Sequence, residues 1–158
     1  MSRKIDIKLA ITENDFSEAK KLISEYIIWL GFDLAFQNID KEMNSLQEMY
    51  SKPVGGLLLA MVDGKPAGVA GIRKFEGNDC ELKRMFVKAD FRGIGLGKEL
   101  IVAAIELAKN LNYKCIKLDT ADFMKDAISL YARNGFIEIP AYRFNPHEAA
   151  RYFELKLN

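Results

Sequence analysis

The chain has 158 residues, 49% of them hydrophobic and 28% charged, with a formal net charge of +1. These values are typical of one globular domain over residues 1–158, and so small a net charge excludes the broad basic surface that extended nucleic acid requires. No apolar run is long enough to span a membrane, and the first six residues lack the apolar segment of a signal peptide. Cys80 and Cys115 are too few for a disulfide framework or a metal site. We therefore expect buried thiols, no metal and a cytoplasmic location.

The first third of the chain predicts a strand followed by two helices. Apolar and polar residues alternate over residues 5–9, as in a half-buried strand. Thr12 or Asn14 then caps an amphipathic helix that ends at Gly31, and a second helix covers residues 39–49.

The middle of the chain predicts three antiparallel strands. Residues 57–62 and 67–72 are rich in apolar residues, and the turn at residues 63–66, Asp-Gly-Lys-Pro, joins them. An Asp-Gly turn between two such runs is a strong hairpin signal. A second turn leads into the third strand, residues 81–87.

A glycine-rich stretch, residues 91–98, separates this strand from an amphipathic helix. Glycine lets the main chain turn tightly and approach an anion, and the first amides of a helix have no intrahelical partner. The stretch therefore predicts a phosphate site. It lacks the Gly-Lys-Ser/Thr of a P-loop, and it follows an antiparallel meander instead of opening the parallel unit of a dinucleotide fold.

The last third of the chain predicts a strand at 115–119, a helix capped by Asp122 and ended by Gly135, and strands at 136–139 and 152–157. The full order is β-α-α-β-β-β-α-β-α-β-β. It indicates an α/β fold with a mixed sheet, antiparallel in its N-terminal half and with a parallel pair around the central helix.

Two motifs in this order resemble the GNAT superfamily of N-acetyltransferases. The first is Arg92-x-x-Gly95-x-Gly97, and the second is Ala127-Ile128-x-Leu130-Tyr131-x-x-x-Gly135-Phe136. The resemblance covers residues 5 to 157 and implies acetyl-coenzyme A as the acetyl donor and an amine as the acceptor.

The resemblance also implies which residues bind the coenzyme. The main chain of Met85, Phe86 and Val87 would receive the pantetheine arm, and an N–H near Phe86 or Val87 would stabilise the oxyanion. The pyrophosphate would lie on the glycine turn, formed by Arg92, Gly93, Ile94, Gly95, Leu96, Gly97 and Lys98.

Tyr131 and Glu81 are the predicted catalytic residues. Tyr131 would be the general acid that protonates the departing thiolate, and the alternative is a tyrosine of the core. Strand alternation places Glu81 on one face with Lys83, Met85 and Val87, and the resemblance implies that Glu81 is the base. The alternative for Glu81 is an ion pair with Lys83 or Arg84.

Two further positions bear on the chemistry. His147, the only histidine, is interpreted as a loop residue near the acceptor site. Met124 stands where many relatives carry an asparagine, so that polar role is either missing or supplied by Asp119, Thr120 or Asp122.

The resemblance places the acceptor between the first two helices and the loop before the last strand, and the predicted wall is Trp29, Phe32, Phe36 and Tyr142. We expect acetyl transfer to a primary amine of a small metabolite by direct attack in a ternary complex, and a monomer or homodimer. The alternatives are acetylation of a protein N-terminus or lysine, and a non-catalytic acyl-CoA-binding module.

Overall fold

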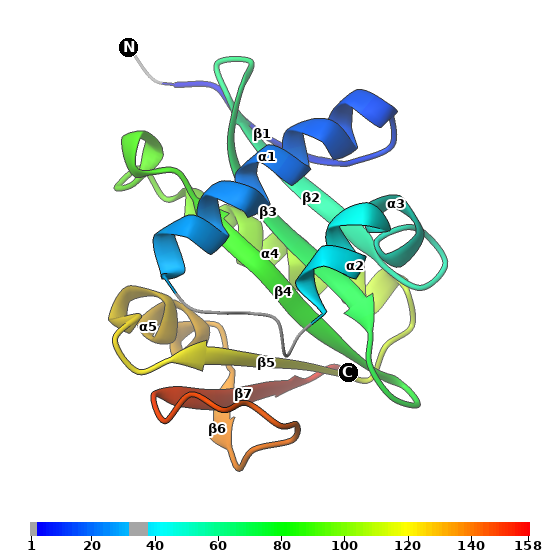
Figure 1. Cartoon of the computed structure of the whole chain (residues 1–158), viewed down its shortest axis with the longest axis vertical. Helices are drawn as coiled ribbons and strands as arrows, with labels where there is room; N and C mark the ends of the chain where they lie inside the picture. The colour runs from blue at the N-terminus through cyan, green and yellow to red at the C-terminus, as the bar shows by residue number, and fades with distance from the viewer. Residues whose placement is uncertain (1–2, 32–37) are drawn as a thin grey trace.

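The computed structural model describes residues 3–31 and 38–158 and contains a seven-stranded sheet (Figure 1). The predicted acceptor residues Phe32 and Phe36 lie outside the described residues. The strands are β1 (Ile5–Leu9), β2 (Gly56–Val62), β3 (Lys65–Lys74), β4 (Asp79–Val87), β5 (Cys115–Ala121), β6 (Ile137–Ile139) and β7 (Ala150–Lys156). The helices are α1 (Glu13–Leu30), α2 (Ile39–Asn44), α3 (Leu46–Met49), the 3₁₀ helix η2 (Ala89–Phe91), α4 (Leu96–Asn110) and α5 (Lys125–Arg133).

The sheet order is β1-β2-β3-β4-β5-β7-β6. Strands β4 and β5 are parallel, and the other neighbouring pairs are antiparallel. The predicted mixed α/β fold is therefore confirmed, with the parallel pair joined by helix α4.

Two apolar cores lie on opposite faces of the sheet. Helices α4 and α5 contribute to one core through residues such as Leu100, Ile101 and Tyr131. Helices α1 and α3 contribute to the other through Ile23 and Leu46, and Figure 1 shows α1, α2 and α3 in front of the sheet and α4 behind it. Both cysteine thiols are free and buried, as predicted. Among the residues that the structure describes, no helix is long and apolar enough to cross a membrane.

The ends of α1 follow from its sequence. Thr12 is the N-cap: its side chain accepts a hydrogen bond from the Asp15 amide at 3.1 Å, and the Asp15 carboxylate accepts one from the Thr12 amide at 3.1 Å. This reciprocal capping box decides for Thr12 over Asn14 as the cap. Gly31 ends the helix in the left-handed conformation, with φ 71°.

Three predicted boundaries were wrong. The helix expected over 39–49 is interrupted at Ser45, whose φ of −131° is not helical, and so forms α2 and α3. Helix α5 starts after Met124 without a side-chain cap, so Asp122 does not cap it. The hairpin turn, expected over residues 63–66, consists of Asp63 and Gly64 alone, and β3 starts at Lys65. The φ angles of these two residues, 50° and 79°, are those of a two-residue turn.

A bulge in β4 shapes the functional region. Strand β3 pairs Val69 with Phe86 and Gly71 with Lys83, so β4 has one extra residue between these pairs. Arg84 there has a φ of 60°. The extra residue reverses the alternation of side chains. The predicted shared face was therefore wrong, because Met85 and Val87 contact the α4-side core while Glu81 and Lys83 point to the other side.

Strands β4 and β5 separate after Glu81, just before the bulge. Their parallel pairing covers only Asp79 to Glu81 on β4, opposite Cys115 to Lys117 on β5. Figure 1 shows the two strands diverging from the end near the C-terminus. The two strands therefore splay apart, and a cleft opens between them in the middle of the sheet.

Candidate active site

A groove of about 740 Å³ lies beside the second half of β4. Nine of the ten predicted coenzyme-binding residues line it, and Ile94 is the exception. Helix α5 closes the opposite side, where Lys125, Ala127, Leu130 and Arg133 are part of the lining. The segment predicted to bind the coenzyme therefore lines this groove, and residues that were not predicted for it, such as Tyr26 and Trp29 of α1 and those of α5, complete the lining.

The three glycines of the turn have different structural roles. Gly93 and Gly95 have φ angles of 82° and 83°, which other residues rarely adopt, and Gly95 is the N-cap of α4. A Cβ on either would project into open space. A Cβ on Gly97 would lie 3.3 Å from the Leu130 side chain, so this glycine lets α4 approach α5 closely. The turn thus exposes the first amides of a 15-residue helix to the groove.

The groove has the charge that a pyrophosphate needs. Arg92, Lys98, Lys125 and Arg133 all line it. The Arg92 Nε donates to the Val87 carbonyl at 3.0 Å, and its guanidinium lies 5.5 Å from the centre of the Trp29 ring. Trp29, predicted as part of the acceptor wall, therefore lines this groove. The glycine cradle, the four cations and the groove volume fit coenzyme A.

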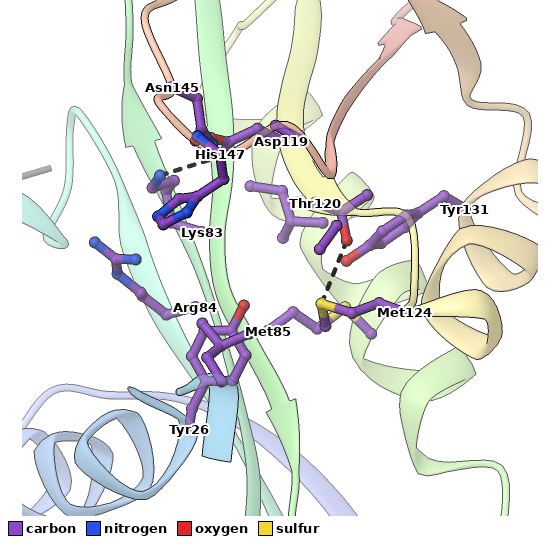
Figure 2. Close-up of a pocket in the computed structure, with 14 residues that line it drawn as sticks. Tyr26, Lys83, Arg84, Met85, Asp119, Thr120, Met124, Tyr131, Asn145 and His147 are labelled. Carbon is purple, nitrogen blue, oxygen red and sulfur yellow. Dashed lines mark hydrogen bonds and ion pairs between the residues drawn. The ribbon is translucent and has the colours of Figure 1, made fainter. Parts of the chain in front are cut away.

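A second cavity, of about 60 Å³, lies in the gap between β4 and β5 (Figure 2). Its polar lining comes from separate parts of the chain: Lys83 and Arg84 of β4, Asp119 and Thr120 of β5, and Asn145 and His147 of the loop before β7. Tyr26, Met85, Met124 and Tyr131 line both this cavity and the groove. These four residues therefore mark the place where the two cavities meet.

Tyr131 lies at this junction with its hydroxyl directed into the cavity, beside Thr120 and Met124 (Figure 2). Burial is the main cause that raises the pKa of Tyr131 above its ordinary value of 10.0, and the charge of Asp119 also contributes. Burial likewise raises the pKa of Tyr26 to about 12. Both phenols therefore keep their protons at neutral pH and can act as donors.

Lys83 and Asp119 form the ion pair of the cavity, with Nζ and Oδ1 3.6 Å apart and both side chains at most 5% exposed. Burial lowers the pKa of Lys83 to about 8, although Asp119 opposes the shift. Burial alone would raise the pKa of Asp119, but the charge of Lys83 and its other partners lower it. Asp119 therefore stays a carboxylate.

Met124 occupies the position of the family asparagine. Its sulfur accepts a hydrogen bond from the Thr120 hydroxyl at 3.6 Å, and it lines both cavities. Asp119 and Thr120 add polar groups to the smaller cavity, whereas Asp122 lines neither.

Glu81 and Tyr142 lie together but outside the lining of both cavities. The Glu81 carboxylate is buried and accepts hydrogen bonds from the Tyr142 hydroxyl and from Arg143, both at 2.7 Å. Arg73 is 3.5 Å from its other oxygen. The ionic partners of Glu81 are thus Arg73 and Arg143, not the Lys83 or Arg84 of the sequence-based alternative.

Sequence reasoning missed Glu42, which is 1% exposed. Its carboxylate accepts hydrogen bonds from Arg84 at 2.8 and 3.0 Å, from Arg73 at 3.0 Å and from the Tyr50 hydroxyl at 3.0 Å. These bonds hold the side chain of the bulge residue, Arg84. The sequence does hold a signal for Glu42. It lies three residues after Ile39 and four before Leu46, which places a charged residue on the apolar face of the predicted helix.

Comparison with known proteins agrees with the fold. Residues 23–136 match the Acetyltransferase (GNAT) family. A Schizosaccharomyces pombe protein named an uncharacterized N-acetyltransferase is 33% identical over 156 residues, covering 98% of this chain and 96% of its own length.

Solved structures show the same fold. A GNAT acetyltransferase from Staphylococcus aureus Mu50 superposes with a TM-score of 0.78 at 24% identity, covering 98% of this chain and 100% of its own. The PaiA N-acetyltransferase of Thermoplasma acidophilum, solved with coenzyme A, superposes with a TM-score of 0.73 at 18% identity. The match covers 98% of this chain and 99% of the PaiA chain. The chain belongs to the Acetyltransferase (GNAT) family. It is an acetyltransferase with acetyl-coenzyme A as cosubstrate, and the predicted family and cosubstrate are confirmed.

Proposed function

We propose that this acetyltransferase transfers the acetyl group to a primary amine of a small metabolite, by direct attack with both substrates bound. The observation that supports this proposal most directly is that the groove and the smaller cavity meet at Tyr26, Met85, Met124 and Tyr131. A donor lying in the groove and an amine in the cavity would then come together at the Tyr131 hydroxyl.

The size of the smaller cavity supports a small acceptor. A cavity needs a volume of at least about 10–15 Å³ to hold one water molecule, so this cavity of about 60 Å³ holds only a few heavy atoms. Its lining is polar on one side, with Lys83, Asp119 and Asn145, which suits a compact amine better than an apolar chain.

Each part of the site has a proposed role. The amides of Gly93 to Lys98 hold the pyrophosphate, with Arg92 and Lys98 adding charge. The main chain from Met85 to Val87 receives the pantetheine arm, and an N–H near Phe86 or Val87 stabilises the oxyanion. The Tyr131 hydroxyl gives its proton to the leaving sulfur. Glu81, enclosed by Arg73, Tyr142 and Arg143, supports the loop before β7 instead of taking a proton from the acceptor.

A panel of primary amines tests the proposal, with thiol release from acetyl-coenzyme A as the assay. It contains α-amino acids, diamines, aromatic amines and a tetrapeptide with a free N-terminus. We expect turnover with one of the small amines and little with the peptide. Turnover with the peptide alone would contradict the small acceptor, and no turnover with any amine would contradict the proposed reaction.

A further inference from the structure

His147 lies in the loop between β6 and β7 and is half-buried. Its ring lines the smaller cavity and extends toward the side chains of Lys83 and Arg84, on the side opposite Tyr131 (Figure 2). An acceptor amine in this cavity would therefore lie between a histidine on one side and the Tyr131 hydroxyl on the other.

The loop holds the backbone of His147 in place. The His147 amide donates to the Asn145 Oδ1 at 3.0 Å, and the Asn145 Nδ2 donates to the Asp119 Oδ2 at 3.2 Å. On the other side, the Ala150 amide donates to the His147 carbonyl at 3.1 Å, and Ala150 pairs with Ala121 of β5. The position of His147 is thus tied to β5 at both ends.

The other titratable and charged groups that line the cavity are poorly suited to take a proton. Tyr26 of α1 and Tyr131 of α5 keep theirs, because burial raises the pKa of both. The Arg84 guanidinium stays charged against Glu42. Asp119 is paired with Lys83, and its pKa is lowered. Lys83, with a pKa of about 8, is the competing candidate, but it is a buried cation held by Asp119.

We propose that His147 is a further catalytic residue, the base that takes a proton from the acceptor ammonium. This inference rests on the proposed amine acetylation. Histidine is the residue type whose ordinary pKa lies nearest neutral pH, which suits it to this task.

The protons and bonds balance as follows. His147 takes one proton from the ammonium and later releases it to solvent, leaving a neutral amine. The amine nitrogen forms the bond to the acetyl carbonyl carbon, and the bond from this carbon to sulfur breaks. Tyr131 gives its proton to the sulfur, and the surplus proton on the new amide nitrogen restores the Tyr131 hydroxyl. The net products are the acetylated amine, the free thiol and one proton.

The test is the pH profile of kcat/KM for wild type and His147→Gln, with an amine that the wild type acetylates. At pH 7 we expect the variant to be about 100-fold slower. The ratio of wild type to variant should shrink as the pH rises toward the amine's own pKa, because a free amine needs no base. The dissociation constant for coenzyme A should not change. Glu148→Gln, at the exposed neighbouring position, is the matched control and should behave as wild type.

A second readout does not depend on turnover. Since the chain has a single histidine, its ring gives one identifiable NMR signal, and diethyl pyrocarbonate modifies one imidazole. We expect the amine, added with coenzyme A, to shift the signal and slow the modification several-fold. An unchanged signal and unchanged modification would contradict the inference.

The outcomes separate this inference from the proposed function. Turnover by the wild type with the same pH profile in His147→Gln overturns the role of His147 alone. A ratio of wild type to variant that shrinks with rising pH for Lys83→Met, but not for His147→Gln, would assign the base to Lys83 and overturn the inference as well. No turnover with any amine would overturn the proposed reaction and, with it, this inference.

Discussion

The groove that we propose for the coenzyme and the smaller cavity that we propose for the acceptor meet at Tyr131, but they are built differently. The groove comes largely from one segment, Met85 to Lys98, and its main features are backbone amides and glycine conformations. The polar side chains of the cavity come from α1, β4, β5, α5 and the loop before β7, and ion pairs hold several of them. A backbone site depends on local sequence, whereas a side-chain site depends on how distant segments pack. Substitutions on the two sides should therefore fail in different ways.

The largest effect is expected on stability, on the acceptor side. Glu42→Gln leaves the buried guanidinium of Arg84 without its carboxylate. Breaking a buried pair in this way destabilises a protein by about 3–5 kcal/mol, which urea unfolding measures. Glu48→Gln, at an exposed position on α3, is the control. A loss below about 1 kcal/mol would mean that the Glu42 network does not hold the bulge.

The next effect is on rate, at the junction of the two sites. Tyr131→Phe removes the proposed proton donor and should lower kcat about 100-fold, while the dissociation constant for coenzyme A and the unfolding midpoint change little. Steady-state kinetics and calorimetry measure these values. If kcat is unchanged, Tyr131 is only a core residue.

The same substitution at Tyr142 should give the opposite result. Tyr142→Phe removes the hydroxyl that donates to the buried Glu81 at 2.7 Å, and a hydrogen bond to a charged group contributes about 1.5–3 kcal/mol. We expect lower stability in urea and nearly unchanged kcat and KM. A large rise in the KM for the amine with normal stability would instead mean that Tyr142 contacts the acceptor, as the sequence predicted.

A smaller effect should distinguish backbone strain from coenzyme binding. Gly95→Ala puts a Cβ on a residue with φ 83°, and Gly64→Ala does the same at φ 79° in the β2–β3 turn. Both should lose about 1–2 kcal/mol of stability. Only Gly95→Ala should bind coenzyme A more weakly, by about tenfold, which equals about 1.4 kcal/mol. Equal affinity in both variants would mean that the pyrophosphate lies elsewhere.

The smallest effect is the dependence of stability on acidity. Burial alone would raise the pKa of Glu42, but its bonds and the charge of Arg84 lower it below the ordinary 4.5. The contribution of the Glu42 carboxylate to the free energy of unfolding is therefore complete above pH 4.5. It is lost as the pH falls through the lower pKa that Glu42 has in the folded protein. Urea midpoints at pH 7, 4.5 and 3.5 should fall less steeply for Glu42→Gln than for wild type or Glu48→Gln. Equal slopes would contradict the lowered pKa.

The sequence by itself determined the order of the elements, the family and the glycine turn that lines the groove beside β4. Apolar periodicity marks strands and helices, and the conformations of Gly93 and Gly95 are local properties of the chain. For the same reason a cap at Thr12 or Asn14 and a turn at Asp63-Gly64 could be predicted, since each forms within a few residues.

Only the tertiary structure decided the acceptor side. One extra residue at Arg84 reversed the faces of β4, so that counting by two from Glu81 no longer reached Met85. Glu42 and Arg84 are 42 residues apart, and Tyr142 and Glu81 are 61 apart, so no local pattern predicts these pairs. A buried charge must find its partner wherever the fold brings one, so Asp119 pairs with Lys83 at the cavity, whereas Glu81 pairs with Arg143 away from it.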